Sequence, residues 1–130
     1  MKSLVVEDDL TSRLLLNVIL APYGECHEAS NGREALEAFK AAKQEGRQYD
    51  LICLDIMMPE MDGQETLKQI REMEEADGIL AGKGVKIIMT TALDDPKNVM
   101  SAHYQVCNAY LVKPIDKAKL LELLMSFGLI

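Results

Sequence analysis

The chain has 130 residues, close to the size of one domain, and 48% of them are hydrophobic while 27% are charged. Fourteen basic residues against 21 acidic ones give a formal net charge of −7, which disfavours direct binding to nucleic acid. No apolar run approaches the ~20 residues that a membrane-spanning helix needs, and an acidic triplet follows the first apolar stretch where a signal sequence would continue. We therefore expect one cytoplasmic domain over residues 1–130, with neither nucleic acid nor a membrane as partner.

The three cysteines give no sign of a disulfide framework or of a zinc site. Cys26, Cys53 and Cys107 are an odd number and none of them forms a CxxC pair. We expect three small thiols that are buried or half-buried.

Apolar runs alternate with amphipathic stretches along the whole chain. Strands are predicted over Lys2–Val6, Glu25–Ala29, Leu51–Leu54, Val85–Met89 and Ala109–Val112. Helices are predicted over Ser12–Ala21, Arg33–Glu45, Gln64–Glu74, Pro96–Tyr104 and the stretch after Asp116. The strands are too apolar to have a solvent-facing side, so this order predicts a doubly wound α/β fold, a parallel sheet with helices on both faces.

Ligands of such sheets bind outside the carboxyl ends of the strands, so the residues just after each strand are the candidate site residues. They are Glu7, Asp8 and Asp9 after the first strand, Asp55 after the third, Thr90 and Thr91 after the fourth and Lys113 after the fifth. Taken alone, acidic residues such as Asp9 and Asp62 are more often helix caps or turn residues.

Together these residues form a chemically coherent set. Carboxylates from neighbouring strands make a pocket of hard oxygen ligands that suits Mg²⁺, and an ammonium with a hydroxyl group completes an anion site. Asp55, on the central strand beside the cation and the lysine, is the natural nucleophile for in-line attack on a phosphoryl group.

At these positions the sequence resembles the receiver domain of two-component response regulators, including the single-domain members of chemotaxis type. Four stretches carry the resemblance, in order: residues 4–9 (LVVEDD), 50–63 (DLICLDIMMPEMDG), 87–92 (IIMTTA) and 110–114 (YLVKP). The resemblance covers nearly the whole chain. It implies a flavodoxin-like (βα)5 fold with a five-stranded sheet of order 2-1-3-4-5.

By this resemblance Asp55 accepts a phosphoryl group from a histidine kinase or a phosphotransfer protein. Glu7, Asp8, Asp55 and the backbone carbonyl of Met57 would hold Mg²⁺. Glu7 stands where the family more often has aspartate, and its extra methylene is expected to move its metal contact outward through a water molecule.

The resemblance also implies how the signal leaves the site. Lys113 and Thr91 would bind the phosphoryl oxygens, and Tyr110, three residues before the lysine, would follow Thr91 inward. The face around the fourth helix, fifth strand and fifth helix would then change and control a downstream protein partner. The Lys113–Pro114 bond matches the family's cis peptide.

Other functions and assemblies remain open from the sequence. A phosphatase with an aspartyl nucleophile needs a second acid two residues after Asp55, where Met57 stands. The alternative is an interaction module that keeps the receiver fold without phosphorylation.

Exposed apolar residues such as Leu14 and Val18 on the first helix are compatible with a monomer or a weak dimer. Apart from its own phosphorylation and dephosphorylation, no enzymatic activity is expected.

Overall fold

The computed structural model describes residues 1–58, 60–92 and 107–130. The described residues form one five-stranded sheet, in which every neighbouring pair of strands is parallel. The strands are β1 (Lys2–Val6), β2 (Glu25–Ala29), β3 (Leu51–Asp55), β4 (Lys86–Thr91) and β5 (Ala109–Val112). They lie in the order β2-β1-β3-β4-β5, so the predicted doubly wound sheet and its strand order are confirmed.

The described helices are α1 (Leu10–Leu20), the short 3₁₀ helix η1 (Ala21–Tyr23), α2 (Gly32–Gln44), α3 (Gly63–Ala76) and α5 (Lys117–Ser126). The helix predicted over residues 96–104 lies outside the described residues. Each of the four longer helices begins after a residue whose side chain accepts a hydrogen bond from a backbone N–H of the first turn. These capping residues are Asp9 for α1, Asn31 for α2, Asp62 for α3 and Asp116 for α5. The predicted capping roles of Asp9 and Asp62 are confirmed. Because Asp9 accepts from the Ser12 N–H, α1 begins at Leu10, two residues before the predicted start.

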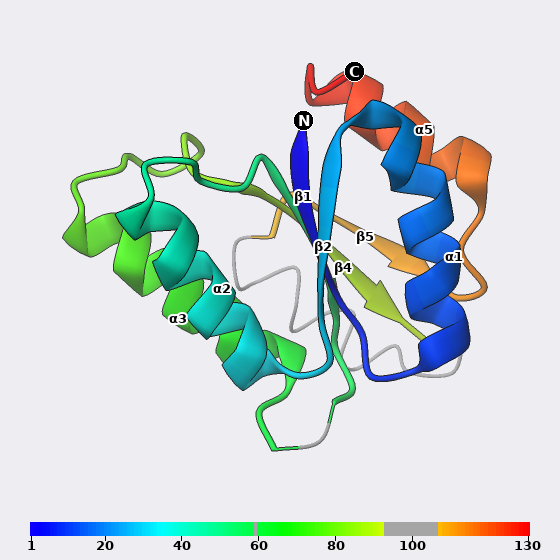
Figure 1. Ribbon diagram of the computed structural model, residues 1–130, viewed down its shortest axis with the longest axis horizontal. Coiled ribbons are helices and arrows are strands. Elements are labelled where there is room, and N and C mark those ends of the chain that lie inside the picture. The colour runs from blue at the N-terminus through cyan, green and yellow to red at the C-terminus, as the bar shows by residue number, and fades with distance from the viewer. Residues whose placement is uncertain (59, 93–106) are drawn as a thin grey trace.

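Helices cover the sheet on both faces (Figure 1): α2 and α3 pack on one side, α1 and α5 on the other. Successive residues of a strand point to opposite faces, so the central strands must be apolar throughout. In β3, for example, Ile52 and Leu54 belong to the core cluster beneath α2 and α3, while Leu51 and Cys53 belong to the other cluster. All four are at most 1% exposed, so the two cores fix the strand firmly.

The first turn of α3 lies close against the end of β3. A Cβ atom on Gly63 would lie 2.2 Å from the Asp55 carbonyl oxygen, and the Gly63 N–H donates to the Ile56 carbonyl at 2.9 Å. A glycine is therefore needed at this position for helix and strand to approach. The Lys113–Pro114 bond is cis, as the resemblance implied.

The cysteines agree with the sequence prediction: Cys53 is buried, Cys26 and Cys107 are half-buried, and none of the three forms a disulfide. Among the described residues, no helix is both long and apolar enough to cross a membrane.

Candidate functional site

An acidic cluster lies at the carboxyl ends of β1 and β3. Glu7 follows β1 and is fully buried, Asp55 is the last residue of β3 and is 3% exposed, and Asp8 is exposed to solvent. One carboxylate oxygen from each of the three lies within 4.8 Å of the others. The fold thus brings together three side chains that the sequence analysis had placed at the ends of neighbouring strands.

Lys113, which follows β5, reaches into this cluster. Its Nζ lies 2.8 Å from Oε2 and 3.0 Å from Oε1 of Glu7, and 3.4 Å from Oδ2 of Asp55. Its backbone N–H donates to the Thr91 carbonyl at 2.7 Å, which holds the lysine at the ends of β4 and β5. Among the described residues, Lys113 is thus the cationic side chain of the cluster, and its main partner is Glu7.

The charges in the cluster interact strongly because the side chains are buried. Burial raises the pKa of Asp55 to about 7, and the negative charge of Glu7 adds to this effect, while Lys113 opposes it. Burial by itself would lower the pKa of Lys113, but its hydrogen bonds and ion pairs with Glu7 and Asp55 outweigh burial and raise it. Without a further cation, the pocket thus holds more negative charge than the lysine offsets.

The backbone on both sides of Glu7 is fixed by hydrogen bonds. The Glu7 N–H donates to the Ala29 carbonyl at 3.0 Å, and Nη1 of Arg13 in α1 donates to the Glu7 carbonyl at 3.1 Å. Oε1 of Glu7 also accepts from the Asp9 N–H at 3.2 Å. Sequence reasoning missed the contact of Arg13, whose position one turn into α1 was the signal that could have suggested it.

The cluster has the ligand chemistry that Mg²⁺ prefers. Its donors are carboxylate oxygens, and Mg²⁺ binds such hard oxygens while retaining several water molecules. Oε2 of Glu7 is buried and faces Lys113 as an ion pair, yet it accepts no hydrogen bond of good geometry. A buried charged oxygen with spare capacity for a partner fits a cation-binding role.

Of the other predicted site residues, Thr91 and Met57 lie at the same edge of the sheet as this cluster, and Tyr110 lies farther back in β5. Thr91 ends β4 and is fully buried, with its hydroxyl donating to the Ala92 carbonyl at 3.4 Å. Met57 is 58% exposed, and its backbone N–H donates to Oδ1 of Asp55 at 3.3 Å. Tyr110 is 45% exposed in β5, where it pairs with Met89 rather than lying against the acidic cluster.

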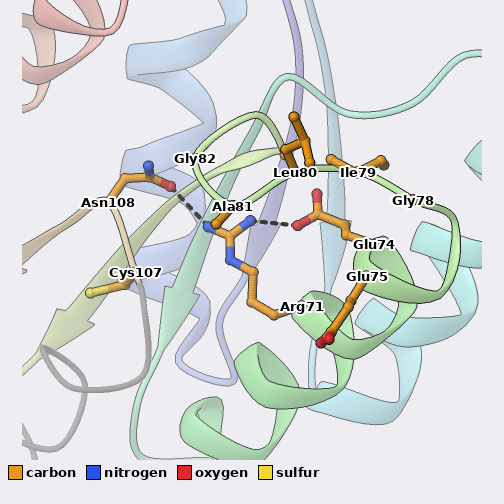
Figure 2. A pocket seen from close by; sticks show the side chains of 11 residues that line it. Arg71, Glu74, Glu75, Gly78, Ile79, Leu80, Ala81, Gly82, Cys107 and Asn108 are labelled. Atoms are coloured by element: carbon orange, nitrogen blue, oxygen red, sulfur yellow. Dashed lines mark hydrogen bonds and ion pairs between the residues drawn. The ribbon is translucent and has the colours of Figure 1, made fainter.

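A separate cavity of about 540 Å³ lies between the end of α3, the segment leading into β4 and the residue before β5 (Figure 2). Arg71 crosses it, donating to Glu74 at 2.7 Å, to the Val85 carbonyl at 2.9 Å and to Asn108 at 3.0 Å. Val85 and Asn108 precede β4 and β5, so the cavity lies at the amino ends of these strands, opposite Asp55. The contacts of Arg71 join α3 to the sheet, which is a structural role.

Comparisons with known proteins agree with this geometry. The sequence profile of the response regulator receiver domain matches residues 3–125. The chain is 32% identical over 123 residues to the chemotaxis protein CheY of Thermotoga maritima, covering 93% of this chain and 92% of that protein. It is 31% identical to the chemotaxis protein CheY of Bacillus subtilis, covering 92% and 90% of the two chains.

A solved structure is similar over the same extent. The chemotaxis protein CheY4 of Vibrio cholerae superimposes with a TM-score of 0.76 at 29% identity, over 97% of both chains. The fold and the acidic site together thus define the class of CheY-like receiver domains. This chain belongs to the response regulator receiver domain family, as the matched residues 3–125 show.

Proposed function

We propose that this protein is a stand-alone response regulator whose Asp55 is phosphorylated in a Mg²⁺-dependent reaction. The observation that carries the proposal is the buried Asp55 carboxylate at the end of the central strand, with Oδ2 3.4 Å from Nζ of Lys113 and Glu7 beside it. Family membership supports it, since the match covers residues 3–125. A phosphoryl group attached to Asp55 would alter the charge of a packed, buried pocket. Such a change can shift the equilibrium of a structural element that has two conformations.

In the proposed reaction a histidine kinase or a phosphotransfer protein presents a phosphohistidine to Asp55. A carboxylate oxygen of Asp55 forms a bond to phosphorus while the bond between phosphorus and the imidazole nitrogen breaks, and its electron pair stays on the imidazole. Lys113 lies where it could neutralise a phosphoryl oxygen beside Oδ2 of Asp55. The Thr91 hydroxyl would donate to another oxygen after leaving the Ala92 carbonyl.

Glu7, Asp8, Asp55 and the Met57 carbonyl would hold the cation. Bound Mg²⁺ would supply positive charge to the transferring phosphoryl group. No catalytic activity is proposed beyond phosphorylation and dephosphorylation of the protein itself.

The signal from phosphorylated Asp55 would reach the protein surface through Thr91 and Tyr110. Inward movement of the Thr91 hydroxyl toward the phosphoryl group would leave space that the half-exposed Tyr110 side chain could enter. The exposed surface of β5 and α5 would then change and alter the binding of a downstream protein. The helix predicted over residues 96–104 lies outside the described residues and is part of this proposal only through the sequence.

Intact-mass measurement after incubation with Mg²⁺ and acetyl phosphate tests the proposal. We expect one added phosphoryl group in the wild type and in Asp62→Asn, a matched control in which an exposed capping aspartate is replaced. Asp55→Asn and the wild type with EDTA should gain none. If the wild type also gains none while another receiver domain is labelled in parallel, the alternative of a receiver-fold interaction module that acts without phosphorylation is supported instead.

A further inference from the structure

The carboxylate of Glu7 already has a cationic partner in the structure. Both of its oxygens lie within 3.0 Å of Nζ of Lys113, closer than the 3.4 Å between this nitrogen and Asp55. An aspartate at this position would be shorter by one methylene, roughly 1.5 Å along the bond. Its carboxylate could not make both contacts from the same backbone position, so the pairing with Lys113 depends on the length of the glutamate.

The backbone of Glu7 has little freedom to adjust. Its N–H donates a hydrogen bond to the Ala29 carbonyl, and its carbonyl accepts one from Arg13, both at about 3 Å. The side chain is fully buried, and Lys113 is only 23% exposed. A cation that binds an oxygen of Glu7 therefore comes close to Nζ of Lys113 and repels it, and this repulsion is relieved by rotation of the glutamate or by movement of Nζ.

We propose that Lys113 and a divalent cation compete for Glu7, so that cation binding releases the lysine for an anion beside Asp55. The inference rests on the proposed function, because it takes Glu7 as a cation ligand and Lys113 as the group that binds the phosphoryl oxygens. It adds an order of events: the cation binds first, and Nζ of Lys113 then becomes available. It also assigns Glu7 a regulatory role that an aspartate at this position would not fill.

Simple charge repulsion also makes Lys113 oppose a nearby cation, whichever acid occupies position 7. A double-mutant cycle separates this repulsion from competition for Glu7. The four proteins are the wild type, Glu7→Asp, Lys113→Met and the variant with both changes. Methionine keeps most of the apolar stem of the lysine and removes its charge.

The measured quantity is the Mg²⁺ dissociation constant, determined by isothermal titration calorimetry at one fixed pH and ionic strength. We expect Lys113→Met to tighten Mg²⁺ binding by about fivefold more in the wild-type background than in the Glu7→Asp background. Glu7→Asp alone should also bind Mg²⁺ more tightly than the wild type. Lys117→Met, which removes the charge of an exposed lysine on α5, is the matched control and should change the affinity little.

Equal effects of Lys113→Met in the two backgrounds would overturn the inference, because the lysine would then act only through its charge. If Lys113→Met does not fold, a crystal structure of the wild type with Mg²⁺ decides the matter: Nζ must no longer contact both Glu7 oxygens. Retention of both contacts beside a bound cation would overturn the inference too. Failure of the proposed function is a distinct result: the wild type would then gain no phosphoryl group from acetyl phosphate, whatever its affinity for Mg²⁺.

Discussion

Without a bound cation beside it, the ionised carboxylate of Asp55 destabilises the folded protein. Asp55 is 3% exposed and close to Glu7, and the pKa of its carboxyl group is raised to about 7 from an ordinary value of 3.8. The folded state therefore binds a proton at Asp55 more tightly than the unfolded state does. As the pH rises from about 4 to about 7, the unfolded chain loses this proton first, and the contribution of Asp55 to stability falls.

Replacing Asp55 with asparagine should consequently stabilise the protein at pH 8. We expect the free energy of unfolding, measured in urea with EDTA, to rise by about 2 kcal/mol. The gain should shrink as the pH is lowered and vanish below about pH 4, where Asp55 is protonated in both states. Asp62→Asn is the matched control and should be nearly neutral, because asparagine also caps helices. A loss of stability in Asp55→Asn at pH 8 would contradict this account of the charges.

Mg²⁺ should reverse this penalty in the wild type. The cation would offset the repulsion between Glu7 and Asp55, whose nearby oxygens belong to the cluster spanning 4.8 Å. We expect added Mg²⁺ at pH 8 to raise the Tm of the wild type and EDTA to lower it again. The shift in Asp55→Asn should be clearly smaller, and equal shifts in the two proteins would place the cation elsewhere.

The contact between α3 and β3 controls the position of Asp55. Gly63 has no room for a side chain, because its Cβ would lie 2.2 Å from the Asp55 carbonyl oxygen. We expect Gly63→Ala to lower the free energy of unfolding by about 1–3 kcal/mol and to slow phosphorylation of Asp55, since helix and strand must separate. Phosphorylation rates from intact mass and urea unfolding provide the two readouts.

Gly46→Ala is the control for this substitution. Gly46 has φ +73° and open space around it, so alanine there should cost about 1 kcal/mol through backbone strain alone. It should leave the phosphorylation rate unchanged. If Gly63→Ala proved no more harmful than Gly46→Ala in both measurements, the close approach of α3 would not matter to the site.

At the level of elements, the sequence predicted most of the fold because its cues are local. The apolar β3 run and the caps at Asp9 and Asp62 are visible in a few adjacent residues, and parallel strands bring Glu7 and Asp55 to one edge. The pairing of Glu7 with Lys113 was not predicted, because the two residues are 106 positions apart and their contact depends on side-chain length. The demand for glycine at position 63 likewise depends on how closely a helix approaches a strand.

For the whole molecule, the surface of α1 bears on the state of assembly. Leu10, Leu14 and Val18 are between 52% and 71% exposed and follow one another at helical spacing. A strip of so few side chains is small compared with the roughly 1,600 Å² that a stable interface buries. The net charge of −7 further disfavours self-association at low ionic strength.

We therefore expect a monomer at micromolar concentration, with a sedimentation coefficient that does not depend on concentration. Analytical ultracentrifugation checks this, and Val18→Asp provides the comparison. A coefficient that rises with concentration in the wild type and stays constant in Val18→Asp would show instead that α1 forms a dimer contact.

The central claim is that the phosphoryl group is carried by Asp55 itself. The most direct measurement is borohydride reduction of the phosphorylated protein, which converts an aspartyl phosphate to homoserine, followed by peptide mass spectrometry. We predict homoserine at position 55 only, and only in samples treated with both Mg²⁺ and acetyl phosphate. Reduction at Asp8 or Glu7 instead, or a phosphoryl group attached with no reduced residue at position 55, would contradict the account.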